Sequence, residues 1–451
     1  MDLDTALKSV AVIGAGGKMG SGIALLLLQE IARLEALQTA NLAGGAYKLE
    51  LMDMSRESLD HLKNYLRVHL KKYAEKNIIK LRSYFSKNPA LVSNEEIVSY
   101  FVDKSLEIAH FGTDLSSCKN VNLIFEAILE DVEVKAHVLR SISTDSSGQS
   151  FYFTNTSSIP IQLLSEKSKI EKRLVGFHFY NPPPIQKLLE IIIPESIDPN
   201  LSEMAVELSK RLNKTLVYSN DRAGFIGNGH FIREMVFAFS LVHEKLKEFP
   251  LSNAIGMMNQ VTKDFLVRPM GIFQLIDYIG IDVCQRIAQI MASCLSDDSL
   301  REPLLDRMVA EGVIGGQYSD GTQKDGFFKY VDSKMEGIYS LEDHRYIPIA
   351  KLDFKKLGPL PEGHISWKKI HEDPHSKEKL FHYFDHLFSS SSLGAKLAIT
   401  YLEKSLKIAE LLVDEKVARS LQDVETVLKL GFYHAYSPQI ILQKENEGKI
   451  R

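Results

Sequence analysis

The strongest constraint on the fold lies near the start of the chain, where a short apolar strand runs into a glycine-rich turn and then into an apolar helix. Residues 9–13 read SVAVI, residues 14–20 read GAGGKMG, and a helix is predicted over residues 21–37. Glycine allows a tight turn here and lets a pyrophosphate approach the backbone amides at the helix N-terminus, where the helix dipole favours negative charge. The segment therefore predicts a dinucleotide-binding α/β domain.

The glycines of this turn are spaced one residue wider than in the usual G-x-G-x-x-G pattern. Gly14, Gly16 and Gly20 form G-x-G-x-x-x-G, whereas the usual pattern read one residue later puts Ala15 in the place of the first glycine. We expect the extra residue to shift the backbone contacts to the pyrophosphate.

A second predicted strand, residues 48–52, ends at Asp53. An acid at this point hydrogen-bonds the ribose hydroxyls of adenosine and repels a 2′-phosphate, so Asp53 favours NAD over NADP. The alternative is that Asp53 begins a turn or caps the helix predicted over residues 55–73. Residues 38–47 stretch the interval between the glycines and the acid beyond the usual ~20 residues, which predicts an inserted loop.

A histidine and a glutamate stand inside two apolar strands of the segment VGFHFYNPPPIQKLLEIIIP, residues 175–194. Strand alternation sends His178 to the face opposite Phe177 and Phe179. Glu190 lies in an apolar run, where an unpaired carboxylate costs several kcal/mol to desolvate, so it requires a partner. His178 is the nearest candidate, and a histidine oriented by a buried carboxylate is the usual construction of a general base. The alternative is a structural histidine.

Composition excludes several classes of protein. The chain has 451 residues, 45% of them hydrophobic and 25% charged, which is typical of a soluble globular protein of two to four domains. A net charge of -4 gives no electrostatic reason to bind nucleic acid or an acidic membrane. Three cysteines without metal-type spacing indicate a reducing compartment and no metal site. With no targeting peptide or membrane-span pattern apparent, we expect a cytoplasmic protein.

Polar side chains follow two further predicted strands, residues 121–125 and 151–155. Glu126 ends the first, and the second runs into Thr156-Ser157-Ser158-Ile159-Pro160. Ser158, followed by Pro160, is predicted to cap a helix. Ser157 is then either a second capping residue or a hydroxyl presented at the carboxyl end of the sheet, where ligands bind in open α/β folds.

Basic side chains follow one another along the helix after Asp53 and just beyond it. They are Lys63, Arg67, Lys71, Lys72 and Lys76. Such a run is either a solvated helix face or a patch for the phosphates of a second ligand.

The chain is predicted to change from α/β to helical after a last strand at residues 215–219. Residues 79–109, 223–247 and 272–294 are predicted to be helical, and residues 339–349 to form a hairpin. The layout of residues 423–438 echoes that of residues 254–271, which suggests a degenerate duplication. We therefore expect a Rossmann-type domain at 1–220, a helical domain at 221–330, and a hairpin with a second helical copy at 331–451.

Six motifs occur in an order that resembles the L-3-hydroxyacyl-CoA dehydrogenase family. They are AVIGAGGKMGSGIA, FEAILEDVEVK, TNTSS, GFHFYNPPPIQKLLEI, AGFIGN and RPMGIFQLIDYIGID, and they extend over residues 10–326. The hairpin YSLEDHRYIPI and the second helical copy resemble the longer form, in which an enoyl-CoA hydratase is fused to the dehydrogenase.

The resemblance implies NAD-dependent oxidation of (S)-3-hydroxyacyl-CoA to 3-oxoacyl-CoA in fatty acid β-oxidation. His178 would be the general base, Glu190 would orient it, and Ser157 and Asn228 would hydrogen-bond the reacting oxygen and the thioester region. The residues expected at the cofactor are Gly14, Gly16, Gly17, Lys18, Met19, Asp53, Glu126, Lys135 and Asn155. Lys76 is expected to contact the acyl-CoA substrate.

The resemblance also implies partners. A separate enoyl-CoA hydratase and a thiolase would supply the neighbouring steps, and the protein would be a homodimer or a monomer whose second helical copy takes the place of a partner subunit. Two alternatives stay open. One is a dehydrogenase of a small hydroxy acid without CoA, and the other is a non-enzymatic binding or structural protein on the same fold.

Overall fold

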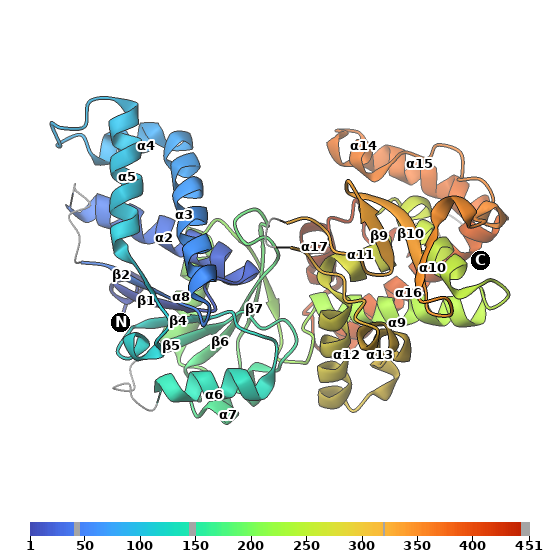
Figure 1. The fold of residues 1–451 in the computed structure, drawn as a ribbon, viewed down its shortest axis with the longest axis horizontal. Helices are drawn as coiled ribbons and strands as arrows, with labels where there is room; N and C mark the ends of the chain where they lie inside the picture. The colour runs from blue at the N-terminus through green and yellow to red at the C-terminus, as the bar shows by residue number, and fades with distance from the viewer. Residues whose placement is uncertain (40–45, 144–149, 319–320, 443–451) are drawn as a thin grey trace. The chain divides into compact units, whose positions relative to one another are not determined.

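The first part of the chain is built on one mostly parallel sheet with helices on both faces (Figure 1). The computed structural model describes residues 1–39, 46–143, 150–318 and 321–442, which separate into two units, Met1–Arg222 and Ala223–Arg451. The sheet of the first unit has the strand order β3-β2-β1-β4-β5-β6-β7-β8. The strands are β1 Ser9–Ile13, β2 Lys48–Met52, β3 Ala109–Gly112, β4 Leu123–Glu126, β5 Phe151–Thr154, β6 Leu174–Phe179, β7 Leu188–Ile192 and β8 Thr215–Ser219.

Strand direction changes once across this sheet. Neighbouring strands from β3 to β6 are parallel, β7 is antiparallel to β6, and β8 is parallel to β7. Every residue of β4, β5, β6 and β7 is buried, as expected for central strands covered on both faces. The predicted Rossmann-type fold is confirmed.

Two groups of helices cover the two faces of the sheet. In Figure 1, α6 and α7 lie together along one face, and α2, α3 and α5 lie on the other. The helices of this unit are α1 Leu3–Ala6, α2 Lys18–Thr39, α3 Arg56–Lys76, α4 Ile78–Tyr84, α5 Asn94–Ile108, α6 Val132–Ser143, α7 Ile161–Ser168 and α8 Pro199–Arg211. A single hydrophobic cluster joins α2, α3, α5 and α8 to the sheet.

The two sheet faces differ in chemistry. Phe125, Phe153, Phe177 and Phe179 contact one another ring to ring and belong to the cluster beneath α2. The alternating residues therefore face α6 and α7, and His178 is among them. The predicted separation of His178 from the phenylalanines is confirmed.

The region between β2 and β4 departs from the expectation of an unbroken helical segment. Residues 79–109 form parts of α4 and α5, and the chain then adds β3 to the edge of the sheet beside β2. The strand was missed because it is only four residues long and its burial is incomplete. Of the inserted loop expected at residues 38–47, residues 40–45 lie outside the described part of the chain.

The cap of α7 is not the predicted one. The helix begins at Ile161 after Pro160, and Ser158 does not cap it. Instead, the Asp221 carboxylate accepts the backbone N–H groups of Ile161 at 2.6 Å and Gln162 at 2.7 Å. The capping side chain is 60 positions away in sequence, so no local pattern indicated it.

The second unit is mainly helical and carries a small antiparallel sheet. Its longer helices are α9 Gly227–Glu244, α10 Leu251–Gln260, α11 Ile272–Ile279, α12 Ile281–Leu295, α13 Pro303–Ala310, α14 Trp367–Glu372, α15 Ser376–Ser389, α16 Leu393–Asp414 and α17 Leu421–Gly431. A π-helical turn, Val261–Phe265, follows α10. The single helix predicted at 272–294 is divided by Gly280, whose φ of +115° interrupts α-helical geometry.

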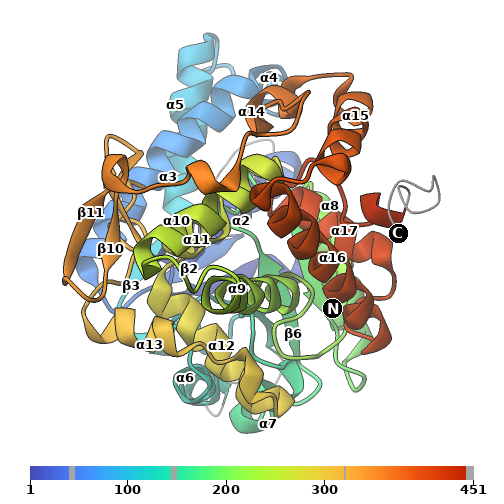
Figure 2. The same cartoon turned by 90° about the vertical axis from the view of Figure 1, so that its right-hand side faces the viewer.

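The hairpin lies within a three-stranded sheet of order β11-β10-β9. Its strands are β9 Phe328–Val331, β10 Lys334–Ser340 and β11 Arg345–Pro348, so the predicted hairpin is present and β9 extends it. Helix α16 packs against α9 within this unit (Figure 2). One hydrophobic cluster draws on residues from Ala223 to Ile441, so the division of this region at residue 330 stays a proposal. Among the described residues, none of the helices has the length and apolar character needed to cross a membrane.

The long-range cap of α7 gives a test of stability. Replacing Asp221 with alanine removes the acceptor for two backbone N–H groups, so the free energy of unfolding should fall by about 0.5–2 kcal/mol, as for other helix caps. Urea denaturation followed by circular dichroism measures the change. Asp221→Asn, which keeps an acceptor oxygen, should lose less. An Asp221→Ala protein as stable as the wild type would contradict this assignment.

Candidate functional site

Strands β6 and β7 bring His178 and Glu190 directly opposite each other. The antiparallel register pairs the two residues, and Nδ1 of His178 lies 2.9 Å from Oε2 of Glu190. Glu190 is fully buried and His178 is 8% exposed. The Glu190 carboxylate therefore has the partner that its apolar surroundings require.

This contact determines which histidine nitrogen can take up a proton. When Nδ1–H donates to the Glu190 carboxylate, Nε2 carries the lone pair of the neutral ring. A proton accepted at Nε2 produces an imidazolium beside a carboxylate, which stabilises it. The geometry is that of a histidine base oriented by an acid.

Tyr180 is a third member of this group that sequence reasoning missed. Its hydroxyl donates to the same Oε2 of Glu190 at 2.7 Å, and its ring centroid lies 4.8 Å from that of His178. Burial and the neighbouring carboxylate raise the pKa of Tyr180 well above its usual value, so the phenol remains a donor. Strand alternation contains the signal, because residues 178 and 180 share one face.

The loop after β5 is tied to the strand that carries the histidine. Oδ1 of Asn155 accepts the backbone N–H of Phe179 at 2.8 Å. Asn155 thus joins the tips of β5 and β6, and Ser157 follows two residues later in the same loop. The expected Asn155 and Ser157 both lie at the carboxyl edge of the parallel strands.

A buried ion pair occupies the tip of the neighbouring strand β4. The Lys135 ammonium lies 2.7 Å from Oε1 of Glu126, and Thr154 Oγ1 donates to Oε2 of Glu126 at 2.6 Å. Burial opposes the charge on Lys135, yet Glu126 and Glu130 together raise its pKa. Glu126 and Lys135, both predicted as cofactor contacts, therefore form one charged pair between β4 and α6.

Glu130 organises the Ser157 loop and was also missed from the sequence. Its Oε1 accepts hydrogen bonds from Thr156 Oγ1, from the backbone N–H groups of Ser157 and Ser158, and from Ser158 Oγ, at 2.6–3.1 Å. Its Oε2 lies 3.3 Å from the Lys135 ammonium. Burial disfavours the charged carboxylate, but Lys135 and these donors outweigh it and lower the pKa of Glu130. Sequence spacing alone gave no sign of this loop contact.

The glycine turn after β1 has no room for side chains at three positions. A Cβ at Gly14, Gly16 or Gly20 would lie 2.6, 2.6 or 2.0 Å from its nearest neighbour, and Gly14 has a φ of +77°. At Gly17 the nearest atom would be 3.3 Å away. The structure thus favours the wider spacing G-x-G-x-x-x-G over the reading that replaces the first glycine with Ala15.

Asp53 closes this turn from the tip of β2. Its Oδ2 accepts the backbone N–H of Gly16 at 3.0 Å and its Oδ1 accepts that of Ser55 at 3.0 Å. The N-cap of α3 is Ser55, whose hydroxyl accepts the backbone N–H of Ser58. Asp53 is therefore not the helix cap. Its contact with Ser55 begins a turn, as one alternative predicted, and its other oxygen holds the glycine turn.

The remaining expected residues belong to α2, α3 and the second unit. Lys18 and Met19 begin α2 directly after the glycine turn. Lys76 ends α3, about 30 Å along the helix from the tip of β2. Asn228 belongs to the first turn of α9 in the second unit, so its part in the site stays a proposal.

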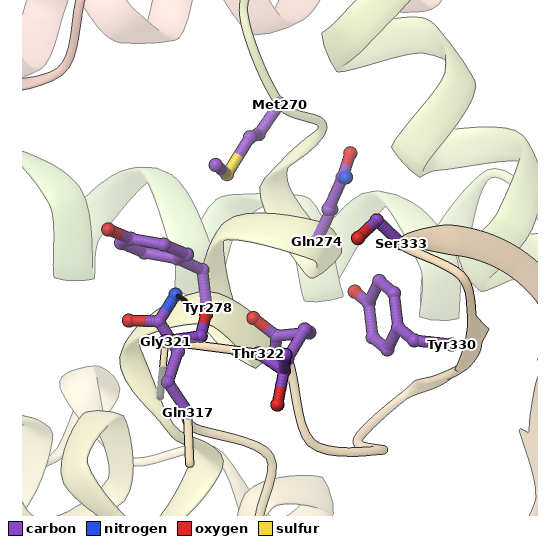
Figure 3. A pocket seen from close by; sticks show the side chains of 9 residues that line it. Met270, Gln274, Tyr278, Gln317, Gly321, Thr322, Tyr330 and Ser333 are labelled. Atoms are coloured by element: carbon purple, nitrogen blue, oxygen red, sulfur yellow. Dashed lines mark hydrogen bonds between the residues drawn. The ribbon is translucent and has the colours of Figure 1, made fainter. Parts of the chain in front are cut away.

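The second unit contains a pocket of about 360 Å³ (Figure 3). Amides, hydroxyls and one thioether line it, from Met270, Gln274, Tyr278, Gln317, Thr322, Gln323, Tyr330 and Ser333 among others. The Tyr330 hydroxyl donates to the buried Asp277 carboxylate at 3.0 Å. None of the residues predicted to bind cofactor or substrate, or to take part in catalysis, lines this pocket. Across the described ranges, no cluster of three or more histidine, cysteine or acidic side chains is arranged to hold a metal ion.

Comparison with known proteins identifies two domains of one family. Residues 9–222 match the NAD binding domain of 3-hydroxyacyl-CoA dehydrogenase, and residues 224–325 match its C-terminal domain. The boundary between the matches coincides with the boundary between the two structural units.

Related proteins cover the chain to different extents. A putative fatty acid oxidation complex trifunctional enzyme of Rickettsia prowazekii is 28% identical over 448 residues, which are 96% of this chain and 52% of that protein. This chain thus spans about half the length of that relative. The mitochondrial hydroxyacyl-coenzyme A dehydrogenase of Sus scrofa is 28% identical over 332 residues, 72% of this chain and 91% of that protein.

Solved structures show the same fold. M. tuberculosis FadB2 is 25% identical and covers 72% of this chain and 99% of its own, with a TM-score of 0.53. The 3-hydroxybutyryl-CoA dehydrogenase of Escherichia coli K12 has a TM-score of 0.62 at 19% identity, and covers 98% of this chain and 92% of its own. The fold beyond residue 325 therefore also occurs in a solved structure. Because the two domain models together match most of the chain, this protein belongs to the 3-hydroxyacyl-CoA dehydrogenase family.

Proposed function

We propose that this protein oxidises (S)-3-hydroxyacyl-CoA to 3-oxoacyl-CoA with NAD, in fatty acid β-oxidation. The single observation that carries the proposal is the buried contact between His178 and Glu190 in a chain of this family. A histidine oriented in this way suits removal of a hydroxyl proton near neutral pH.

The residues at the strand tips fit NAD. Helix α2 begins at Lys18 directly after the glycine turn, so a pyrophosphate at this turn would meet the N-terminus of a helix. Gly14, Gly16 and Gly17, followed by Lys18 and Met19, would hold it. Asp53 would bind the ribose hydroxyls and repel a 2′-phosphate.

The proposed chemistry needs one base and one hydride acceptor. NAD, when bound, supplies the hydride acceptor. His178 takes the proton of the 3-hydroxyl at Nε2 while hydride leaves C3, so a carbonyl forms at C3. Glu190 stabilises the imidazolium that results. General base catalysis of this kind contributes about 10²–10⁴ in rate, and the rest comes from holding the reactants in register.

The other strand-tip residues have positioning roles in this proposal. Ser157 hydrogen-bonds the reacting oxygen, with its backbone held by Glu130. Glu126, Lys135 and Asn155 form the wall beside the nicotinamide. Asn228 and Lys76 are proposed contacts of the substrate, from the helical unit and from the end of α3 respectively.

The proposed partners follow from the relatives. Enoyl-CoA hydratase and thiolase activities would precede and follow this reaction, and the similarity to a putative trifunctional enzyme of fatty acid oxidation supports such a grouping. Packing of α16 on α9 supports a monomer in which the second helical region takes the place of a partner subunit, while a homodimer stays open. The cytoplasmic location is likewise a proposal.

Activity can be tested directly. Purified protein should oxidise NADH rapidly when acetoacetyl-CoA is the substrate. The rate should be much lower when free acetoacetate replaces acetoacetyl-CoA, or when NADPH replaces NADH. His178→Ala should lower kcat by about 10²–10⁴ because the proton donor is lost. Absorbance at 340 nm measures all four conditions. Equal rates with acetoacetate would favour a small hydroxy acid as substrate, and no turnover despite tight NADH binding would favour a binding protein.

Glu130 allows a second prediction. Glu130→Ala leaves four donors without their acceptor and removes one of the two carboxylates beside the buried Lys135, so the free energy of unfolding should fall by about 2–4 kcal/mol. The kcat should also fall, because Ser157 loses its fixed position. Glu133→Ala is the matched control, since Glu133 lies three residues later in α6 and its side chain is 76% exposed. Equal stability and kcat in the two variants would contradict the role given to Glu130.

A further inference from the structure

One oxygen of Glu190 serves two donors. Oε2 lies 2.9 Å from Nδ1 of His178 and 2.7 Å from the hydroxyl of Tyr180. All three side chains are buried or nearly so. The arrangement follows from the fold, because Tyr180 directly follows β6 and alternates with His178, and β7 brings Glu190 opposite His178.

We propose that Tyr180 is a positioning residue that sets the pH at which His178 becomes a base, by sharing the carboxylate oxygen that His178 uses. The inference rests on the proposed function, in which His178 is the base of the dehydrogenase. Tyr180 itself exchanges no proton with the substrate.

The direction of the effect follows from electrostatics. A hydrogen bond from the phenol stabilises the charged carboxylate and draws negative charge away from the oxygen that faces the imidazolium. With the phenol present, the carboxylate attracts the protonated ring less strongly. Tyr180 therefore favours the neutral, basic form of His178, and its removal should extend the protonated form to higher pH.

The phenol also limits the motion of the acid. Two donors on Oε2 hold the Glu190 carboxylate in one orientation, and burial removes competing water. Tyr180 keeps its proton at working pH because burial and Glu190 raise its pKa well above the usual value.

Other titratable groups on the surrounding elements have partners of their own. They are Glu126, Glu130 and Lys135 beside β4 and α6, Tyr152 with Arg173 beside β5, Asp221 after β8, and Lys214 before it. Burial lowers the pKa of Lys214 to about 8, so this ammonium titrates in the range of the assay. It is present in the wild type and in every Tyr180 variant, and its contribution cancels in their comparison.

The first test is the pH profile of Tyr180→Phe, which removes only the hydroxyl. The midpoint of the kcat/KM profile for 3-hydroxybutyryl-CoA oxidation should move to higher pH by about 0.5–1 unit, equivalent to a three- to tenfold change in proton binding. Rates at high pH should change little. Tyr339→Phe is the matched control, because the Tyr339 hydroxyl donates to Glu311 at 2.7 Å in the second unit. A uniform loss of rate without a shifted midpoint would overturn the proposal.

A second readout does not need turnover. In protein labelled with ¹³C at histidine Cε1, the His178 signal is identified by its loss in His178→Gln, and its titration is followed by NMR. The His178 midpoint should be higher in Tyr180→Phe than in the wild type, and an unchanged or lower midpoint would refute the inference. If the midpoint moves but no acyl-CoA is turned over, the proposed function fails while the linkage between Tyr180 and His178 stands.

A third experiment strengthens the hydrogen bond donated by the Tyr180 hydroxyl instead of removing it. 3-Fluorotyrosine has a more acidic phenol and donates a stronger hydrogen bond. Its incorporation at all 17 tyrosines should lower the His178 midpoint in the wild type. The same labelling of Tyr180→Phe should leave the midpoint unchanged, and an equal shift in both backgrounds would assign the effect to other tyrosines.

Discussion

The buried carboxylate of Glu190 is the group on which the geometry of the first unit depends most strongly. It lies in the middle of β7 between leucine and isoleucine side chains, fully removed from water. Leaving such a charge unpaired costs several kcal/mol. The structure offsets that cost with donors from the adjacent strand, His178 and Tyr180. A shift of one residue in the pairing of β6 with β7 would turn these side chains to opposite faces, so the charge also specifies the register.

The same principle operates at the neighbouring strand tips. Glu126 and Lys135 are buried and Glu130 is partly buried beside them. Each carboxylate is satisfied by the ammonium and by hydroxyl or amide donors. The resulting network joins β4, α6 and the loop after β5. Polar groups that a cofactor and a substrate would meet are therefore held by one another before any ligand binds, which is the preorganisation that efficient catalysis requires.

The sequence pattern predicted those elements of the fold that depend on neighbouring residues along the chain. The strands at β2 and β8 and the separation of His178 from the phenylalanines follow from alternation and burial. The cap of α7 by Asp221 and the loop contacts of Glu130 were not predictable, because they join residues that only the folded sheet brings together. Gly280 was read as part of one helix because an isolated glycine is tolerated in helices, and its positive φ belongs to the tertiary structure. The sequence could have indicated that Tyr180 shares a face with His178, because the two residues alternate along the strand direction. It could not show that both contact the same oxygen of Glu190.

We infer that the charge of Glu190, rather than its shape, makes His178 an effective base. The most direct test is Glu190→Gln, which keeps the size of the side chain and an acceptor oxygen but removes the charge. We expect kcat with acetoacetyl-CoA and NADH to fall by about 10²-fold or more, while the Kd for NADH stays within a factor of two. A variant that retains wild-type kcat across the pH range would contradict the claim.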